Sequence, residues 1–168
     1  MSKPRVAVVM GSDSDFPVME ASVKQLRAFD ENVHVEVMSA HRGPARVVEF
    51  AKQAEADGIE VIIAAAGMSN ALAGAIAAHT CLPVIGVPLV GGALSGLDAL
   101  LSTVQMPPGV PVATVALGEA GAKNAALLAV QIIARHDAKL AAAFKKFKSE
   151  QAKAVEAKNL ALLERLGR

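Results

Sequence analysis

Five short apolar runs decide what this chain can fold into. They are rich in Val, Ile and Ala, and they cover residues 5–11, 33–38, 61–67, 83–88 and 110–117. Runs of this length and composition, bounded by Gly, Pro or polar residues, are typical of strands in a buried sheet. Because residues with helical spacing lie between most of them, the sequence predicts a parallel sheet rather than hairpins.

The segments between the runs predict the covering helices. Apolar residues three and four positions apart indicate helices over residues 16–29, 44–57, 71–78 and 120–135. Strands that alternate with helices are typical of an α/β protein with right-handed crossovers and helices on both faces of the sheet. We therefore expect a single domain over residues 1–168, in which residues 137–168 form a C-terminal helical arm rich in Ala and Lys.

Composition narrows the class of partner. Lys and Arg number 17 against 16 Asp and Glu, so the net charge of +1 offers no bulk attraction to a nucleic acid polymer or a membrane. No apolar run approaches the ~20 residues of a membrane span, and no signal peptide is visible, so we expect a cytoplasmic protein. The single cysteine, Cys81, excludes an internal disulfide. A small molecule is the expected ligand.

Four unusual loops follow the first four predicted strands, at residues 11–15, 39–44, 67–74 and 88–96. In an open parallel sheet, ligands bind outside the carboxyl ends of the strands. Taken singly, each loop has an ordinary explanation: Ser12 and Asp15 as helix caps, the glycines as turn residues, and His41 as a structural histidine. Their convergence on one edge indicates a binding site.

The residue types in these loops suggest a chemistry. Backbone N–H groups of Gly11 and Ser12 could hold a phosphate at a helix N-terminus, and Arg42 could clamp the same phosphate. Asp15 suits a ribose hydroxyl or an amine, because its charge repels phosphate. Histidine is the residue type whose unperturbed pKa allows proton transfer near neutral pH, which makes His41 the candidate proton carrier. The loops therefore predict a substrate that carries a phosphosugar, together with one proton shuttle.

Several cofactor motifs are absent from the sequence. It has no G-x-x-x-x-G-K-[ST] loop, no G-x-G-x-x-G after a strand, and no Tyr or Trp. The remaining histidines, His34, His79 and His136, are scattered and have no metal-ligand spacing. We expect a reaction without cofactor or metal.

Three motifs resemble one enzyme family. The sequences MGSDSD (10–15), SAHRGP (39–44) and 94–118, the last followed by KNAALLA (123–129), closely resemble the N5-carboxyaminoimidazole ribonucleotide mutases, the bacterial type of the aminoimidazole ribonucleotide carboxylase family of purine biosynthesis. The resemblance covers about residues 5–135. It implies a flavodoxin-like three-layer αβα sandwich with a five-stranded sheet, and a homo-octamer with sites at subunit junctions. It also implies transfer of a carboxylate from the exocyclic nitrogen to ring carbon C4, without metal or cofactor.

The family pattern also assigns roles to residues. It implies that Ser12, Asp15 and Arg42 bind the ribonucleotide and that His41 carries the proton. CO2 released from the carbamate would have to stay beside C4, under a cover that we expect from the glycine-rich loop 91–96. The full set expected to bind substrate is Gly11, Ser12, Asp13, Asp15, Ser39, Ala40, Arg42, Gly67, Ser69, Asn70, Ala71 and Leu72.

One loop departs from the family pattern and leaves alternatives open. Residues 67–74 read GMSNALAG where the mutases typically carry GGAAHLPG, so Ala71 stands in place of a histidine. Ser69-Asn70 resembles the related carboxylases that use CO2 directly, although Met68 replaces their arginine. Since residues 86–88 and 105–107 resemble the mutases, we expect a mutase. The alternatives are a direct carboxylase and a non-catalytic flavodoxin-like module that binds a nucleotide.

Overall fold

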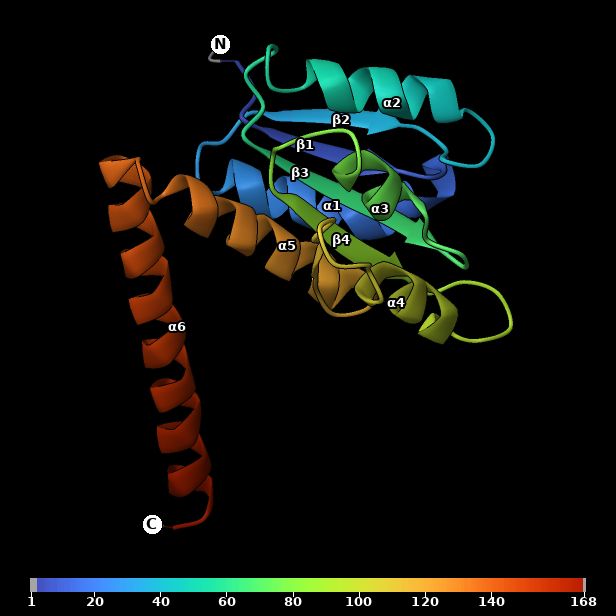
Figure 1. Cartoon of the computed structure of the whole chain (residues 1–168). Coiled ribbons are helices and arrows are strands. Elements are labelled where there is room, and N and C mark those ends of the chain that lie inside the picture. The colour runs from blue at the N-terminus through green and yellow to red at the C-terminus, as the bar shows by residue number, and fades with distance from the viewer. Residues whose placement is uncertain (1–2, 168) are drawn as a thin grey trace.

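The sheet is parallel throughout and has the strand order β2-β1-β3-β4-β5. The computed structural model describes residues 3–167 (Figure 1). The strands are β1 (Val6–Met10), β2 (Val33–Val37), β3 (Val61–Gly67), β4 (Val84–Leu89) and β5 (Ala113–Thr114). The helices are α1 (Phe16–Arg27), α2 (Pro44–Gln53), α3 (Leu72–Ala77), α4 (Leu97–Val104), α5 (Gly118–Ile133) and α6 (Ala138–Arg165), with a 3-10 turn η1 (Asp13–Asp15) before α1.

Two apolar clusters hold helices on opposite faces of the sheet. Successive strand side chains point to opposite faces, so Val6 and Val8 join α1 and α5 in one cluster, whereas Ala7 and Val9 join α2 and α3 in the other. The central strands β1, β3 and β4 are buried along nearly all their length. These layers confirm the predicted α/β sandwich.

Helix α4 packs closely on β4, and Gly86 makes this possible. A Cβ on Gly86 would lie only 2.4 Å from Cγ2 of Thr103 in α4 and 2.9 Å from Cγ1 of Val112. No side chain fits there without movement of the helix. The close packing brings α4 against the strand end that borders the loops of the expected site.

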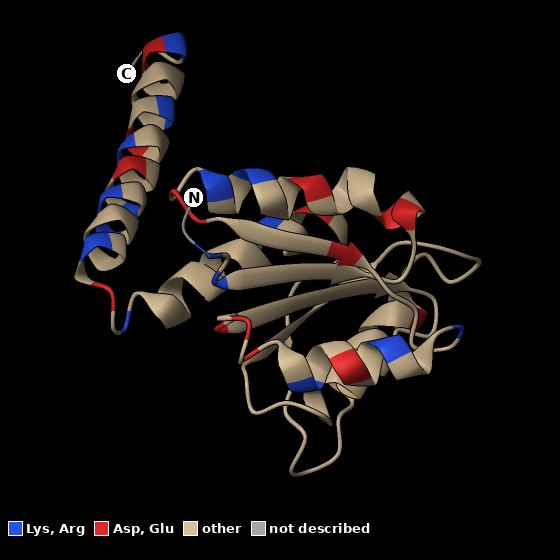
Figure 2. Ribbon diagram, turned by 90° about the horizontal axis from the view of Figure 1, so that it is seen from above, with Lys and Arg blue, Asp and Glu red and all other residues tan. Residues whose placement is uncertain are grey.

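Helix α6 is fastened to the domain at its first turns. The rings of Phe29, Phe144 and Phe147 pack together with centroids 5.6–6.1 Å apart. Arg5 pairs with Asp137, the N-cap of α6, at 2.7 Å. Beyond this anchor the helix extends away from the sheet (Figures 1 and 2), and its exposed apolar side chains are Val155, Leu160 and Leu162. The predicted helical extension is confirmed.

Two elements differ from the sequence prediction. Helix α4 was not expected, because the exposed Leu97, Leu101 and Val104 share the helix with buried apolar positions and blur the helical period. Strand β5 pairs over only two residues instead of eight, and Pro111 has no N–H to donate to a sheet. Within residues 3–167, no helix is both long and apolar enough to cross a membrane.

Gly86→Ala should lower the free energy of unfolding by about 1–3 kcal/mol, because the added methyl overpacks the contact between α4 and β4. The matched control is Gly91→Ala, where a Cβ meets nothing within 4 Å. Its cost should stay below about 0.5 kcal/mol. Urea denaturation measures both. Equal costs for the two variants would contradict the close packing of α4.

Candidate functional site

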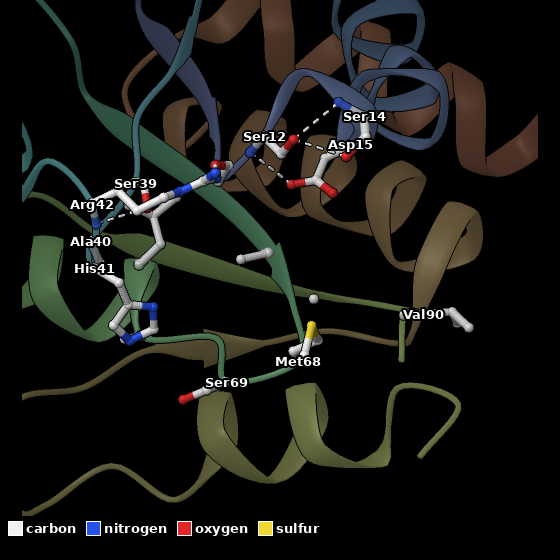
Figure 3. Close-up of a pocket in the computed structure, with 16 residues that line it drawn as sticks. Ser12, Ser14, Asp15, Ser39, Ala40, His41, Arg42, Met68, Ser69 and Val90 are labelled. Carbon is white, nitrogen blue, oxygen red and sulfur yellow. Dashed lines mark hydrogen bonds between the residues drawn. The ribbon is translucent and has the colours of Figure 1, made fainter. Parts of the chain in front are cut away.

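The carboxyl ends of the strands surround a cavity of about 620 Å³ (Figure 3). This volume suits a ligand of nucleotide size. Its walls come from the loops after β1, β2, β3 and β4, as the sequence predicted. The lining residues are Gly11, Ser12, Ser14, Asp15, Ser39, Ala40, His41, Arg42, Ala66, Gly67, Met68, Ser69, Ala71, Leu72, Val90 and Gly91.

The loop after β1 does not offer the backbone donors that the sequence suggested. The Gly11 N–H donates to the Ala65 carbonyl at 3.0 Å, because the parallel ladder continues one residue past β1. The Ser12 N–H donates to Oδ2 of Asp15 at 3.0 Å in a capping box. The expectation that these two N–H groups hold an anion is therefore wrong for this conformation. The hydroxyls of Ser12 and Ser14 remain at the cavity wall.

The SAHRGP turn brings Arg42 across to the first loop. Oγ of Ser39 accepts from the Arg42 backbone N–H at 3.2 Å and from its Nε at 3.4 Å. Nη2 of Arg42 donates to the Gly11 carbonyl at 3.2 Å. The guanidinium thus bridges the loops after β1 and β2, and it is the only Lys or Arg side chain among the described residues that line the cavity. An anionic group of a ligand would bind here.

His41 faces the cavity from the side opposite Val90 (Figure 3). Its side chain is exposed, and its ring has no hydrogen-bond partner among residues 3–167. An imidazole without an internal partner can exchange a proton with a bound ligand. His34, His79 and His136 do not line this cavity, and each contacts a residue elsewhere.

Asp15 is the carboxylate of the cavity wall. Burial raises its pKa, and the nearby charge of Asp13 adds to the effect, whereas the hydrogen bond from the Ser12 N–H and the nearby Gly11 N–H oppose it. A carboxylate beside the Ser12 and Ser14 hydroxyls can accept a hydrogen bond from a sugar hydroxyl. Asp13 does not line the cavity; its Oδ1 contacts the Ser12 hydroxyl and the Ser14 N–H instead.

The loop after β3 forms the wall below His41. Met68 adopts a left-handed conformation with φ of 55°, and both Met68 and Ser69 are exposed to the cavity. Asn70, which was expected beside them, points the other way and is 1% exposed. Its amide Nδ2 donates to Oγ1 of Thr103 at 2.9 Å. The structure thus brings Ser69 and Ala71 into the cavity but leaves Asn70 behind its wall.

Five lining residues were missing from the sequence-predicted set: Ser14, Ala66, Met68, Val90 and Gly91. Each is adjacent to a loop residue that was singled out, and Gly91 begins the loop expected to cover the site. Ala66 and Val90 carry no polar or titratable group, so their residue types give no sign in the sequence that they line a site. No group of three or more His, Cys, Asp or Glu residues that could hold a metal ion occurs in the described part of the chain.

Comparison with known proteins decides the family. The model of the family described as AIR carboxylase matches residues 5–154 of the chain. The chain belongs to the AIR carboxylase family. The "N5-carboxyaminoimidazole ribonucleotide mutase" of Pyrococcus abyssi is 52% identical over 147 residues, which cover 88% of this chain and 83% of that protein. The protein of the same name from Mycobacterium tuberculosis is 51% identical over 164 residues, covering 98% of this chain and 92% of its own.

A solved structure of this family supports the same fold. The crystal structure of Treponema denticola PurE superposes with a TM-score of 0.86 at 31% sequence identity, covering 95% of this chain and 98% of that one. The flavodoxin-like sandwich implied by the sequence motifs is therefore confirmed.

Asp15→Asn should stabilise the protein at neutral pH but not in acid. Because burial raises the folded pKa of Asp15 above its unfolded value of about 3.9, its ionisation opposes folding. That cost is absent below the unfolded pKa and complete once the pH has risen through the folded pKa. Asparagine stays neutral and keeps an oxygen that can accept from the Ser12 N–H.

Urea midpoints of the wild type and Asp15→Asn, measured at about pH 3 and about pH 7.5, test this prediction. The variant should be the more stable protein at the higher pH, and the difference should shrink in acid. A difference that grows as the pH falls would contradict the raised pKa.

Proposed function

We propose that this protein converts N5-carboxyaminoimidazole ribonucleotide into 4-carboxy-5-aminoimidazole ribonucleotide in purine biosynthesis. The observation that carries the proposal is the placement of His41 and Arg42, adjacent in sequence, in a cavity of nucleotide size at the strand ends. The curated relatives that share about half of the residues are named as mutases for this compound. The enzyme would be an isomerase.

The two sides of the cavity suit the two parts of the substrate. Arg42 and the hydroxyls of Ser12 and Ser39 would bind the phosphate, since a guanidinium can offer two parallel N–H groups to an oxyanion. Asp15 would accept a hydrogen bond from the ribose. The imidazole ring would then lie between His41 and the apolar wall that Ala66 and Val90 form.

The proposed reaction moves one carboxylate and one proton. The bond from the exocyclic nitrogen to the carboxyl carbon breaks; its electron pair stays on nitrogen, which takes a proton from His41, and CO2 is released. Carbon C4 then forms a bond to CO2, and His41 removes the C4 proton. The ring electrons are restored and His41 returns to its starting state, so no oxidant or co-reactant is consumed. This role is general acid-base catalysis, which contributes about 10²–10⁴-fold in rate.

CO2 must remain in the cavity between these steps. Met68, Val90 and Gly91 form a wall without charge beside the expected position of C4. Such a wall offers CO2 no hydration and keeps it within reach of C4, so recapture becomes effectively intramolecular. The glycine-rich loop that begins at Gly91 would cover it.

Direct use of CO2 from solution is the less favoured alternative. The sequence motif Ser69-Asn70 suggested two side chains that could orient an incoming carboxylate. Asn70 is turned away from the cavity and bonds to Thr103, so only Ser69 of the pair is available there. A non-catalytic nucleotide-binding module would have no need of an unpartnered histidine in the cavity.

We also propose a homo-octamer in the cytoplasm, with the C-terminal arm packed on neighbouring subunits. Exposed apolar side chains support the assembly. They occur on α4, at Leu97, Leu101 and Val104, on the free part of α6, at Val155, Leu160 and Leu162, and just after α6, at Leu166. The single cysteine fits a reducing compartment.

His41→Asn should lower turnover by at least about 100-fold while substrate affinity changes by less than about tenfold, because only the proton transfer is lost. Turnover is followed by the ultraviolet absorbance of the aminoimidazole ribonucleotides. His79→Asn is the control, since His79 bonds to the Ala75 carbonyl outside the cavity. Near-normal turnover of His41→Asn would remove this residue from the mechanism.

Light scattering at micromolar concentration should give a mass close to eight chains. Truncation after Ala152 retains the anchor at Phe144 and Phe147 but removes the exposed apolar residues of α6. We expect the truncated chain to form smaller assemblies with lower activity. A wild-type monomer would contradict the octamer. A truncated chain that still assembles into eight copies and keeps its activity would contradict the role of the arm.

A further inference from the structure

We infer that Asn70 is a positioning residue: with Ser102 and Thr103 of α4, it fixes the cavity loop that carries Met68 and Ser69. This inference rests on the proposed function for its kinetic readout only. The residues form one connected set of hydrogen bonds behind the cavity wall, which we call the Asn70 latch and define as Asn70, Ser102 and Thr103.

The latch joins the loop to the helix at two points. The backbone N–H of Asn70 donates to Oγ of Ser102 at 2.9 Å. The side-chain Nδ2 donates to Oγ1 of Thr103 at 2.9 Å and lies 3.5 Å from the Val87 carbonyl. Both hydroxyls are in turn held by α4 itself, since Ser102 donates to the Asp98 carbonyl at 2.8 Å and Thr103 to the Ala99 carbonyl at 2.6 Å. The loop is therefore tied to a helix rather than to another loop.

The amide donors, not the amide oxygen, account for an asparagine at this position. Oδ1 of Asn70 is buried and has no partner among the described residues. A buried acceptor without a partner costs free energy. That cost is tolerated when the other atom of the same amide makes hydrogen bonds that the fold requires. The amide nitrogen Nδ2 makes these hydrogen bonds, and they hold the loop against both α4 and β4.

The loop needs such support because its conformation is unfavourable. Met68 holds a left-handed backbone although it has a side chain, and this region favours glycine. On either side of Asn70, Ser69 and Ala71 line the cavity directly. Without the latch, Met68 and Ser69 would no longer hold their places at the wall that faces His41. Turnover and retention of CO2 would then both fall.

Thr103 allows the latch to be tested apart from packing. Its hydroxyl belongs to the latch, whereas its Cγ2 methyl fills the space over Gly86. Thr103→Val keeps the methyl and loses the hydroxyl; Thr103→Ser does the reverse. Thr114→Val is a matched control on β5, where the buried hydroxyl has no partner among residues 3–167 and does not line the cavity.

Turnover, KM and carboxyl retention are measured for the three variants with the N5-carboxylated substrate in labelled bicarbonate. Thr103→Val should lose roughly tenfold to a hundredfold in kcat with a smaller change in KM, and should incorporate more label, because the wall is displaced. Thr103→Ser should keep turnover within about threefold despite a lower melting temperature, and Thr114→Val within about twofold. Loss of turnover in Thr103→Ser but not in Thr103→Val would show that packing matters and would overturn the inference.

Two further measurements separate this inference from the proposed activity. Hydrogen exchange of residues 67–71 needs no substrate, and it should be faster in Thr103→Val than in Thr114→Val even if the wild type proves inactive. Unchanged exchange would overturn the latch. If Thr103→Val does not fold, Ser102→Ala removes the acceptor of the Asn70 N–H at an exposed position and should shift exchange and label incorporation in the same direction. No shift there would also overturn the latch.

Discussion

The parallel pairing of β1 with β2 and β3 determines where the proposed functional side chains lie. Met10 is level with Val37 on one side and with Ala65 on the other, so β1 and β2 end together and β3 ends two residues further on, at Gly67. Two further hydrogen bonds, from Met38 N–H to Met10 and from Gly11 N–H to Ala65, carry the ladder into the loops. A slip of one residue would turn the buried side chains to the wrong face and separate the loops. The cavity therefore depends on the pairing register of β1 with β2 and β3.

The charge of Arg42 is held in place by the loops at this edge of the sheet. Its hydrogen bonds to Ser39 and to the Gly11 carbonyl fix the guanidinium between two loops before any ligand arrives. A preorganised cation loses less side-chain entropy when it binds an anion. The adjacent His41 lacks such partners among the described residues and stays available for proton transfer.

The fold and much of the site could be predicted from the sequence, for reasons that differ between elements. The strands β1, β3 and β4 are buried on both faces, so their composition alone reveals them. Helix α4 was missed because its exposed leucines disguise the helical period. Asp13 and Asn70 were expected in the cavity because of their chemistry, but each points away from it while its neighbours line it, and no sequence pattern shows which loop residue faces in.

The central claim is that the carboxylate moves within the cavity from nitrogen to C4 of the same substrate molecule. Turnover of N5-carboxyaminoimidazole ribonucleotide by the wild type in labelled bicarbonate tests it most directly. The uncharged wall of Met68 and Val90 predicts that most of the product keeps the carboxyl group of its own substrate. Predominant incorporation of label from solution, with little turnover of the N5-carboxylated compound, would contradict the account and identify a direct carboxylase.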